Sequence, residues 1–211
     1  MLKQINMSQS LSMNRSMSQT NGATLNGTWL FIFIELLLFA GLFLLYGVYR
    51  YQNQIAFNLA ASELSISSGV INTIILLSGS FTMAITSISI RSRNKMLSLL
   101  LLITTLFIGF MFLVNRYFEW KGRIEFGLFP GSEELARLGH GDVLFFGLYF
   151  FMTGLHALHL LAGFVILTMG TVRVNNNTLT ADNPDFIDKA GTYWHLATLI
   201  WVLVFPLFYL L

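Results

Sequence analysis

Five apolar runs, each long enough to cross a membrane, constrain the fold of this 211-residue chain more than any other feature. A helix needs about 20 apolar residues to span the roughly 30 Å of hydrocarbon in a bilayer. The runs cover approximately residues 28–49, 68–90, 96–118, 142–172 and 190–211. They lack the alternation of apolar and polar residues that is typical of barrel strands, so each segment must pair its backbone groups as a helix. The sequence therefore predicts an all-α, polytopic membrane protein, a bundle of five transmembrane helices.

The composition agrees with this class and excludes several others. Hydrophobic residues make up 55% of the chain and charged residues only 10%, whereas a water-soluble domain carries about 25% charged residues. The net charge of +2 and the absence of a basic cluster predict no nucleic-acid partner. Because the chain has no cysteine, it offers no thiolate nucleophile, no iron–sulfur ligand and no cysteine-bridged copper centre.

The polar segments suggest how the chain is organised. Residues 1–27 are rich in Ser, Met and Asn, so we expect a disordered polar tail without a cleavable targeting segment, followed by a membrane domain over 28–211. The segment 119–141 mixes both charge signs with Gly and Pro130 and is expected to be a structured cap outside the membrane. The segment 175–188 is expected to be a solvated connector.

The distribution of Lys and Arg predicts the orientation of the chain. In a five-helix chain the N-terminus shares one side of the membrane with the second and fourth loops, and this side carries more Lys and Arg than the other. The strongest signal is the short turn that contains Arg91, Arg93 and Lys95, since short loops obey the positive-inside rule best. We therefore expect the N-terminus inside and the C-terminus outside.

Glu35 is an ionisable residue within the first apolar run. It lies about seven residues from the start of the helix, which corresponds to a depth of roughly 10 Å. Burying a carboxyl group at this depth costs free energy, so such a residue usually has a polar partner or a function. Two interpretations stay open: a hydrogen-bonded acid that packs one helix against another, or a site that handles protons or lipid headgroups.

Three histidines lie within the last two runs and raise the question of a haem or metal site. His156 and His159 are three residues apart on one helix, and His195 lies on the next. We estimate depths of roughly 20 Å for His159 and 9 Å for His195, a difference that disfavours a shared iron. Zinc or copper would need a further acid or thiolate at the same height. The alternative is hydrogen bonding between helices or to lipid headgroups.

Aromatic and small polar residues complete the pattern. Most aromatic residues with a polar atom lie near predicted span ends, where an aromatic belt is expected: Trp29, Tyr46, Tyr49, Tyr51, Trp120, Tyr193 and Trp201. Small and hydroxyl residues inside the spans predict helix-packing seams: Asn72, Thr73, Ser78, Ser80, Thr82, Thr86, Thr153 and Thr198, with Gly79, Gly154 and Gly163. Asn72 is equally compatible with a helix cap.

Five motifs in order resemble the short five-helix form of the haem-copper oxidase subunit III family. The first is TWLFIFIELLLFAGLF, with Trp29 and Glu35, and the second is INTIILLSGSFTMA. NRYFEWKG follows the third run, HGDVLFFGLYFFMTGLHALHLLAG resembles the fourth helix, and YWHLATLIWVLVFPLFYLL the fifth. The resemblance covers nearly everything after residue 27, and its most specific part combines TGLHALHLLAG with YWH.

This resemblance implies a non-catalytic subunit of a respiratory terminal oxidase in the bacterial inner membrane. Such a subunit carries no redox centre, packs against catalytic subunit I, which holds the haems and copper, and belongs to a complex with subunit II or a larger respiratory supercomplex. It also binds phospholipid and supports proton uptake during electron transfer to oxygen. Glu35 would be the family's buried acid, and the residues in contact with lipid or neighbouring helices would be Trp29, His156, His159, Trp194 and His195.

Some positions depart from the family pattern, and two other functions stay open. Thr198 replaces an acid that commonly follows the fifth-helix histidine, and Ala157 and Leu158 separate two histidines where Gly is frequent. The strings EWKG and FPLFYLL look more like the subset associated with nitric oxide reductases, so an accessory subunit of such a reductase is one alternative. A haem-b, quinone-linked membrane module that uses the three histidines is the second.

Overall fold

The computed structural model describes residues 27, 29–179 and 183–210. Within these residues every regular element is a helix, and there is no β-strand. Five of the described helices are long and apolar enough to cross a membrane. The predicted all-α, five-span membrane class is therefore confirmed, whereas the predicted tail lies almost entirely outside the described residues.

The chain divides into two compact units, Met1–Gly41 and Leu42–Leu211. The boundary falls within the first long helix, Trp29–Gln52. In the first unit the described residues form the beginning of this helix. In the second unit the end of the same helix is followed by a short helix, α2 (Gln54–Ser62).

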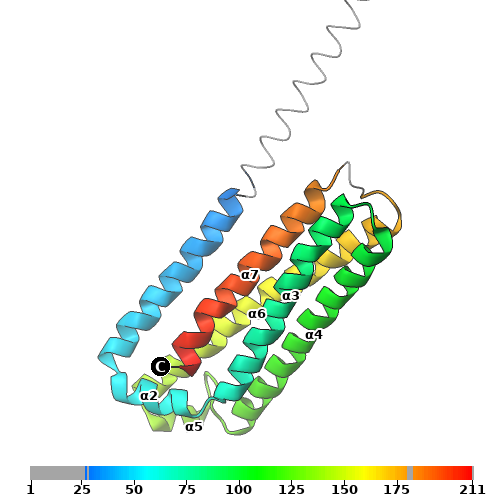
Figure 1. The fold of residues 1–211 in the computed structure, drawn as a ribbon. Coiled ribbons are helices and arrows are strands. Elements are labelled where there is room, and N and C mark those ends of the chain that lie inside the picture. The colour runs from blue at the N-terminus through cyan, green and yellow to red at the C-terminus, as the bar shows by residue number, and fades with distance from the viewer. Residues whose placement is uncertain (1–26, 28, 180–182, 211) are drawn as a thin grey trace, which may run out of the picture. The chain divides into compact units, whose positions relative to one another are not determined.

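Four long helices form a bundle in the second unit (Figure 1). They are α3 (Ile66–Arg91), α4 (Lys95–Glu125), α6 (His140–Asn175) and α7 (Asp185–Tyr209). Each packs against two others, so that the order around the bundle is α3, α4, α6, α7 and back to α3. A side chain that points inward from one helix can therefore meet residues of the other three.

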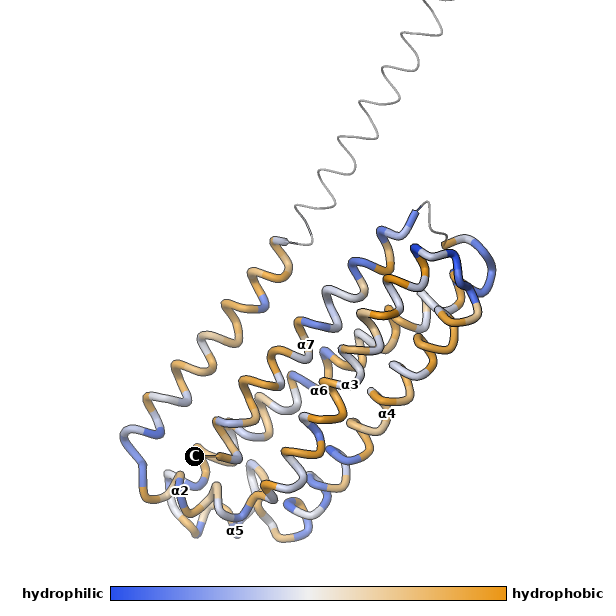
Figure 2. Tube along the Cα trace, viewed as in Figure 1, coloured by the Kyte–Doolittle hydropathy of each residue, from blue (hydrophilic) through white to orange (hydrophobic). Residues whose placement is uncertain are grey.

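The two ends of this bundle differ. The turn between α3 and α4 and the connection between α6 and α7 lie at one end, and α2 and the short helix α5 (Glu133–Leu138) lie at the other (Figure 1). We call them the turn end and the α2/α5 end. Figure 2 shows hydrophobic residues along the helices and hydrophilic residues at both ends, including a group at the turn end. There Lys95 Nζ donates hydrogen bonds to Asn175 O (2.7 Å) and Asn177 Oδ1 (2.8 Å).

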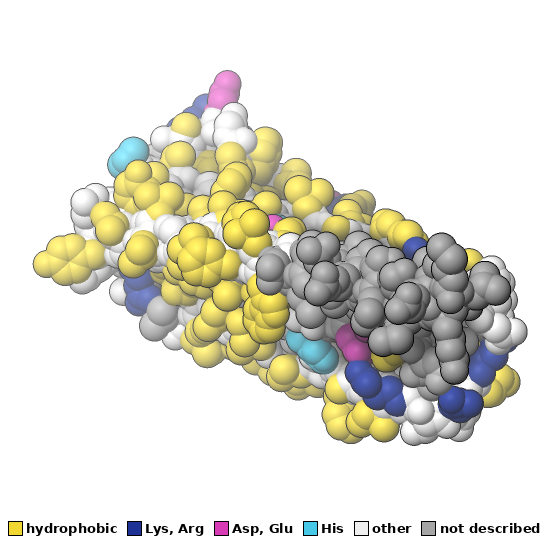
Figure 3. Space-filling view, turned by 90° about the horizontal axis from the view of Figure 1, so that it is seen from above, with side chains coloured by type: hydrophobic (Ala, Val, Ile, Leu, Met, Phe, Trp, Pro, Cys, Tyr) yellow, Lys and Arg dark blue, Asp and Glu magenta, His cyan; other side chains and the backbone are white. Residues whose placement is uncertain are grey.

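The long flank of the molecule is apolar. Figure 3 shows hydrophobic side chains over much of the described surface, with Lys and Arg side chains in scattered places. Phe107, Phe110, Phe151 and Val165 are each more than half exposed. An apolar surface of this extent is costly in water, so the described surface agrees with a chain that lies in a membrane.

The helix bounds correct the predicted loop over 119–141. Helix α4 continues to Glu125, and α5 begins at Glu133, where Ser132 Oγ accepts a hydrogen bond from Leu135 N (3.1 Å). Hydropathy predicts where the apolar run ends. The helix can extend beyond that point, because adding residues to an existing helix is easier than starting a new one. The first part of the predicted loop is therefore helix.

Candidate functional site

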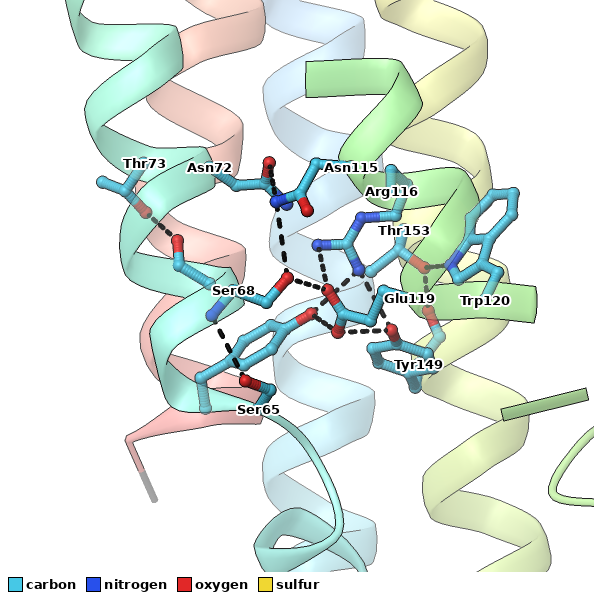
Figure 4. A network of polar contacts seen from close by, with 12 residues as sticks. Ser65, Ser68, Asn72, Thr73, Asn115, Arg116, Glu119, Trp120, Tyr149 and Thr153 are labelled. Atoms are coloured by element: carbon cyan, nitrogen blue, oxygen red, sulfur yellow. Dashed lines mark hydrogen bonds and ion pairs between the residues drawn. The ribbon is translucent and has the colours of Figure 1, made fainter. Parts of the chain in front are cut away.

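A buried polar cluster lies where the four long helices meet, toward the α2/α5 end (Figure 4). Its centre is an ion pair on α4, in which Arg116 Nη2 lies 3.4 Å from Glu119 Oε2. The side chains are only 2% and 5% exposed. Residues three apart lie on the same face of a helix, so α4 directs both charges into the bundle.

Two tyrosine hydroxyls bridge this ion pair. Arg116 Nη1 donates to the hydroxyls of Tyr149 (3.0 Å) and Tyr209 (2.8 Å). The Tyr149 hydroxyl donates to Glu119 Oε1 (2.9 Å), and the Tyr209 hydroxyl donates to the same oxygen. Ser68 Oγ donates to Glu119 Oε2 (2.8 Å). The carboxylate thus joins α4 to α3, α6 and α7, and its charge is compensated by Arg116.

Aromatic rings surround the guanidinium group. Arg116 Cζ lies 4.6 Å from the ring centroid of Trp201, a distance at which a desolvated cation–π contact contributes about 2 kcal/mol. Trp201 is 0% exposed, and its Nε1 donates to Thr73 Oγ1 (3.1 Å). The belt prediction is therefore wrong for Trp201, and also for Tyr46, which is buried and donates to Leu207 O. Both rings point into the bundle. Their distance from the end of an apolar run does not show this direction.

Amides and hydroxyls continue the cluster along α3 and α4. Asn115 Nδ2 donates to Asn72 Oδ1 (2.9 Å), and Asn72 is fully buried. The N-terminus of α3 is capped instead by Ser65, which accepts from Ser68 N, so Asn72 is not a cap. Farther along the same helix pair, the hydroxyls of Thr82 and Thr105 lie 2.8 Å apart. The predicted packing seam is confirmed at these positions.

The three histidines identified in the sequence occupy different environments. The ring of His156 is 0% exposed and packs edge-on against Phe112 at 5.5 Å. His159 Nδ1 lies 2.7 Å from Leu155 O, and His195 Nδ1 forms a hydrogen bond with Ser80 Oγ. In the part of the chain that the structure describes, no three or more His, Cys, Asp or Glu residues are grouped to hold a metal ion.

The estimated depth difference between His159 and His195 was too large. Helix α7 begins at Asp185, five residues before the predicted start, and α6 ends at Asn175, three residues after its predicted end, so depths counted from the predicted ends do not give the relative heights of the two histidines. The Tyr193 hydroxyl donates to His159 O (2.9 Å), which places the two segments side by side. The depth argument against a shared iron therefore fails, although His195 bonds to α3 rather than facing His159.

Trp194 lies at the centre of the bundle, and the other predicted site residues lie on the first helix. The Trp194 side chain is 1% exposed and packs against one glycine from each of α3, α4 and α6, namely Gly79, Gly109 and Gly163. Trp29 is 66% exposed, and Glu35 is partly buried. Both belong to the first unit, whereas Trp194 and the three histidines belong to the second.

The sequence reasoning missed the Arg116–Glu119 cluster. Arg116 lies near the end of the third apolar run, and Glu119 begins the polar segment that follows it. Their opposite charges, three residues apart beside an apolar helix, were the available signal. Tyr149 and Tyr209 gave no local signal, because only the packing of α6 and α7 brings them to α4.

The fold and this cluster define an integral membrane protein whose buried polar residues link its helices. The family model of cytochrome c oxidase subunit III matches residues 2–211. The chain belongs to the cytochrome c oxidase subunit III family.

The individual relatives are all named as oxidase subunit III or as a protein that includes it, but they differ in length. The chain is 30% identical over 188 residues to a heme-copper oxidase subunit I+III of Aeropyrum pernix, covering 86% of this chain but only 22% of that protein. It is 25% identical to subunit 3 of a cytochrome bo(3) ubiquinol oxidase of Buchnera aphidicola, covering 87% and 84% of the two chains. Identity to cytochrome c oxidase subunit 3 of Corynebacterium diphtheriae is 27%, covering 87% and 85%. The chain thus spans about a fifth of the Aeropyrum protein and most of the other two.

Proposed function

We propose that this chain is the non-catalytic subunit III of a respiratory haem-copper terminal oxidase. The observation that carries the proposal is the family match over residues 2–211. In the Aeropyrum relative, subunits I and III are named as one protein, which supports catalytic subunit I as the main partner. Haem and copper would then be held by partner subunits, with subunit II and a larger respiratory supercomplex as further partners.

Purification in a mild detergent, with identification of every co-purifying polypeptide, tests this proposal. We expect a haem-copper catalytic subunit together with a copper-bearing or quinol-type partner. Recovery of a nitric oxide reductase catalytic chain would instead favour the alternative function. Recovery of the chain alone, with a haem Soret band, would favour the haem-b module.

The outer surface supports binding of phospholipid. An apolar groove of about 390 Å³ lies between α4 and α6, and its shape and composition suit an acyl chain. The groove is lined only by hydrophobic residues: Phe110, Leu113, Val114, Tyr117, Phe118, Leu161 and Phe164. Trp29, also on the outer surface, is a further candidate for lipid contact, whereas the buried His156 and Trp194 are proposed to act in helix packing.

Glu35 is proposed to support proton uptake by the complex. It is a partly buried acid in a membrane-spanning helix, the setting in which ionisable residues most often have a function. Replacement Glu35→Gln keeps the shape of the side chain and removes its charge. We expect unchanged haem content, together with a shorter period of sustained turnover or an altered pH profile. Unchanged durability and pH profile in the purified variant complex would refute this role.

The bacterial inner membrane is the proposed location, with the turn end inside. This end carries Arg91, Arg93 and Lys95 between α3 and α4, and Arg173 near the end of α6. A concentration of positive charge on one side favours the cytoplasmic face. The N-terminus would then lie inside and the C-terminus outside.

A further inference from the structure

Several buried nitrogen atoms beside the Arg116–Glu119 cluster have no hydrogen-bond partner among the described residues. They are Asn72 Nδ2 on α3, Arg116 Nε on α4, and both ring nitrogens of His156 on α6. The three residues are 0%, 2% and 0% exposed. Each buried polar group without a partner costs about 1–3 kcal/mol, so atoms of this kind indicate a bound partner of matching chemistry.

These atoms belong to one layer of the bundle. Trp201 lies 4.6 Å from Arg116 Cζ and 5.4 Å from the His156 ring. Phe112 lies 6.0 Å from Arg116 Cζ and 5.5 Å from the same imidazole. Asn72 lies next to this layer, because it is hydrogen-bonded to Asn115 and the adjacent Thr73 accepts a hydrogen bond from Trp201 Nε1. Trp201 and Phe112 thus each lie beside both the guanidinium group on α4 and the imidazole on α6.

We propose that this layer binds ordered internal water, hydrogen-bonded to Arg116, His156 and Asn72. The amide and guanidinium nitrogens only donate hydrogen bonds, whereas a neutral imidazole has one donor and one acceptor nitrogen. A water molecule supplies both roles and makes about three bonds when it is buried. An anion does not suit the layer, because Glu119 already compensates the charge of Arg116.

The water gives the bundle a second polar layer next to the Glu119 network. Glu119 receives its hydrogen bonds from protein hydroxyls, while the far side of Arg116 and the ring of His156 would be solvated by water. This role is independent of the haem and copper of any partner subunit. The test of the bound water is therefore independent of the test of the proposed oxidase function.

Radiolytic labelling in H₂¹⁸O tests the proposal on the purified membrane complex. Hydroxyl radicals formed from bound water oxidise the aromatic side chains beside it, and ¹⁸O marks the product. Phe112 and Phe145 form a matched pair, because both are 0% exposed. Phe112 borders the proposed water layer, whereas Phe145 packs against Phe57, Phe146 and Phe208. We expect Phe112 to be labelled several-fold faster than Phe145.

Two variants locate the water. His156→Phe keeps a ring of similar size but removes both nitrogens, and we expect most of the excess labelling of Phe112 to be lost. His159→Phe is the control, since its Nδ1 lies beside Leu155 O and it should leave the excess unchanged. The wild-type comparison remains decisive if His156→Phe fails to fold.

A cryo-EM map that resolves waters gives an independent readout. We expect density within hydrogen-bond distance of Arg116 Nε and of one His156 nitrogen. Equal labelling of Phe112 and Phe145 would overturn the proposal. A map in which these nitrogens bond directly to protein groups would overturn it as well.

Discussion

The indole of Trp194 lies so close to Gly109 that a Cβ atom at this glycine would come within 2.7 Å of Trp194 Cη2. The same side chain faces Gly163, where a Cβ atom would lie 3.3 Å from Trp194 Cε3. The largest side chain of the bundle centre is thus accommodated by the smallest residues of its neighbours. Small residues at helix interfaces allow this close approach within a membrane.

We expect Gly109→Ala to destabilise the subunit by about 1–3 kcal/mol, the usual cost of overpacking a core. The indole is 1% exposed and is confined by other helices, so it has little room to move. Thermal unfolding of the purified complex, followed by loss of this subunit, measures the effect.

Gly122→Ala is the matched control on the same helix, because nothing lies within 4 Å of a Cβ atom there. Replacing a helical glycine by alanine without a clash stabilises a helix by about 0.5–1 kcal/mol. If Gly109→Ala also proved neutral or stabilising, the close packing of Trp194 would be contradicted.

Replacing Glu119 by Gln should destabilise the bundle strongly. The Arg116 guanidinium would remain buried without its counter-charge, and removing one partner of a buried ion pair costs about 3–5 kcal/mol. Denaturation of the purified complex provides the measurement.

Two comparisons identify the cause of that loss. Glu125→Gln removes an acid whose partner Lys121 is 54% exposed, so it should change stability by no more than about 1 kcal/mol. The double variant Arg116→Met with Glu119→Gln leaves no buried charge and should recover part of the stability. An equal loss in the Glu119 and Glu125 variants would argue against the buried pair.

Tyr209→Phe tests the hydroxyl that connects the end of α7 to α4. This hydroxyl accepts a bond from Arg116 and donates one to Glu119. Its removal should cost about 1–3 kcal/mol, because two buried polar groups lose a partner. Tyr51→Phe, at a position that is 80% exposed, should leave the unfolding temperature nearly unchanged. Similar unfolding temperatures for both variants would show that the Tyr209 hydroxyl contributes nothing.

Hydropathy predicted the number of spanning helices because an apolar run of membrane length leaves the backbone few alternatives. It did not predict helix ends, which depend on local caps such as Ser132 and Asn94. Asn94 Oδ1 accepts from Leu97 N (3.1 Å) at the start of α4. Depths counted from the predicted ends of α6 and α7 therefore gave the wrong relative height for His159 and His195.

The buried Arg116–Glu119 cluster could not be predicted from the sequence for a different reason. The role of Glu119 depends on hydroxyls from three other helices, and no spacing along one helix reveals them. Trp201 illustrates the same limit: it was expected at a membrane interface, whereas it is 0% exposed beside Arg116. Which way a ring points is decided by tertiary packing.

The absence of native cysteine allows a direct test of orientation by single-cysteine labelling. Ser92 lies in the exposed turn between α3 and α4, and Asn58 lies exposed on α2 at the opposite end. With the turn end inside, a membrane-impermeant maleimide should label Asn58→Cys in intact cells and should reach Ser92→Cys only after the membrane is opened. The physical basis is the excess of Lys and Arg at the turn end, since short positively charged loops stay in the cytoplasm. Labelling of Ser92→Cys but not Asn58→Cys in intact cells would reverse the proposed orientation and place the C-terminus inside.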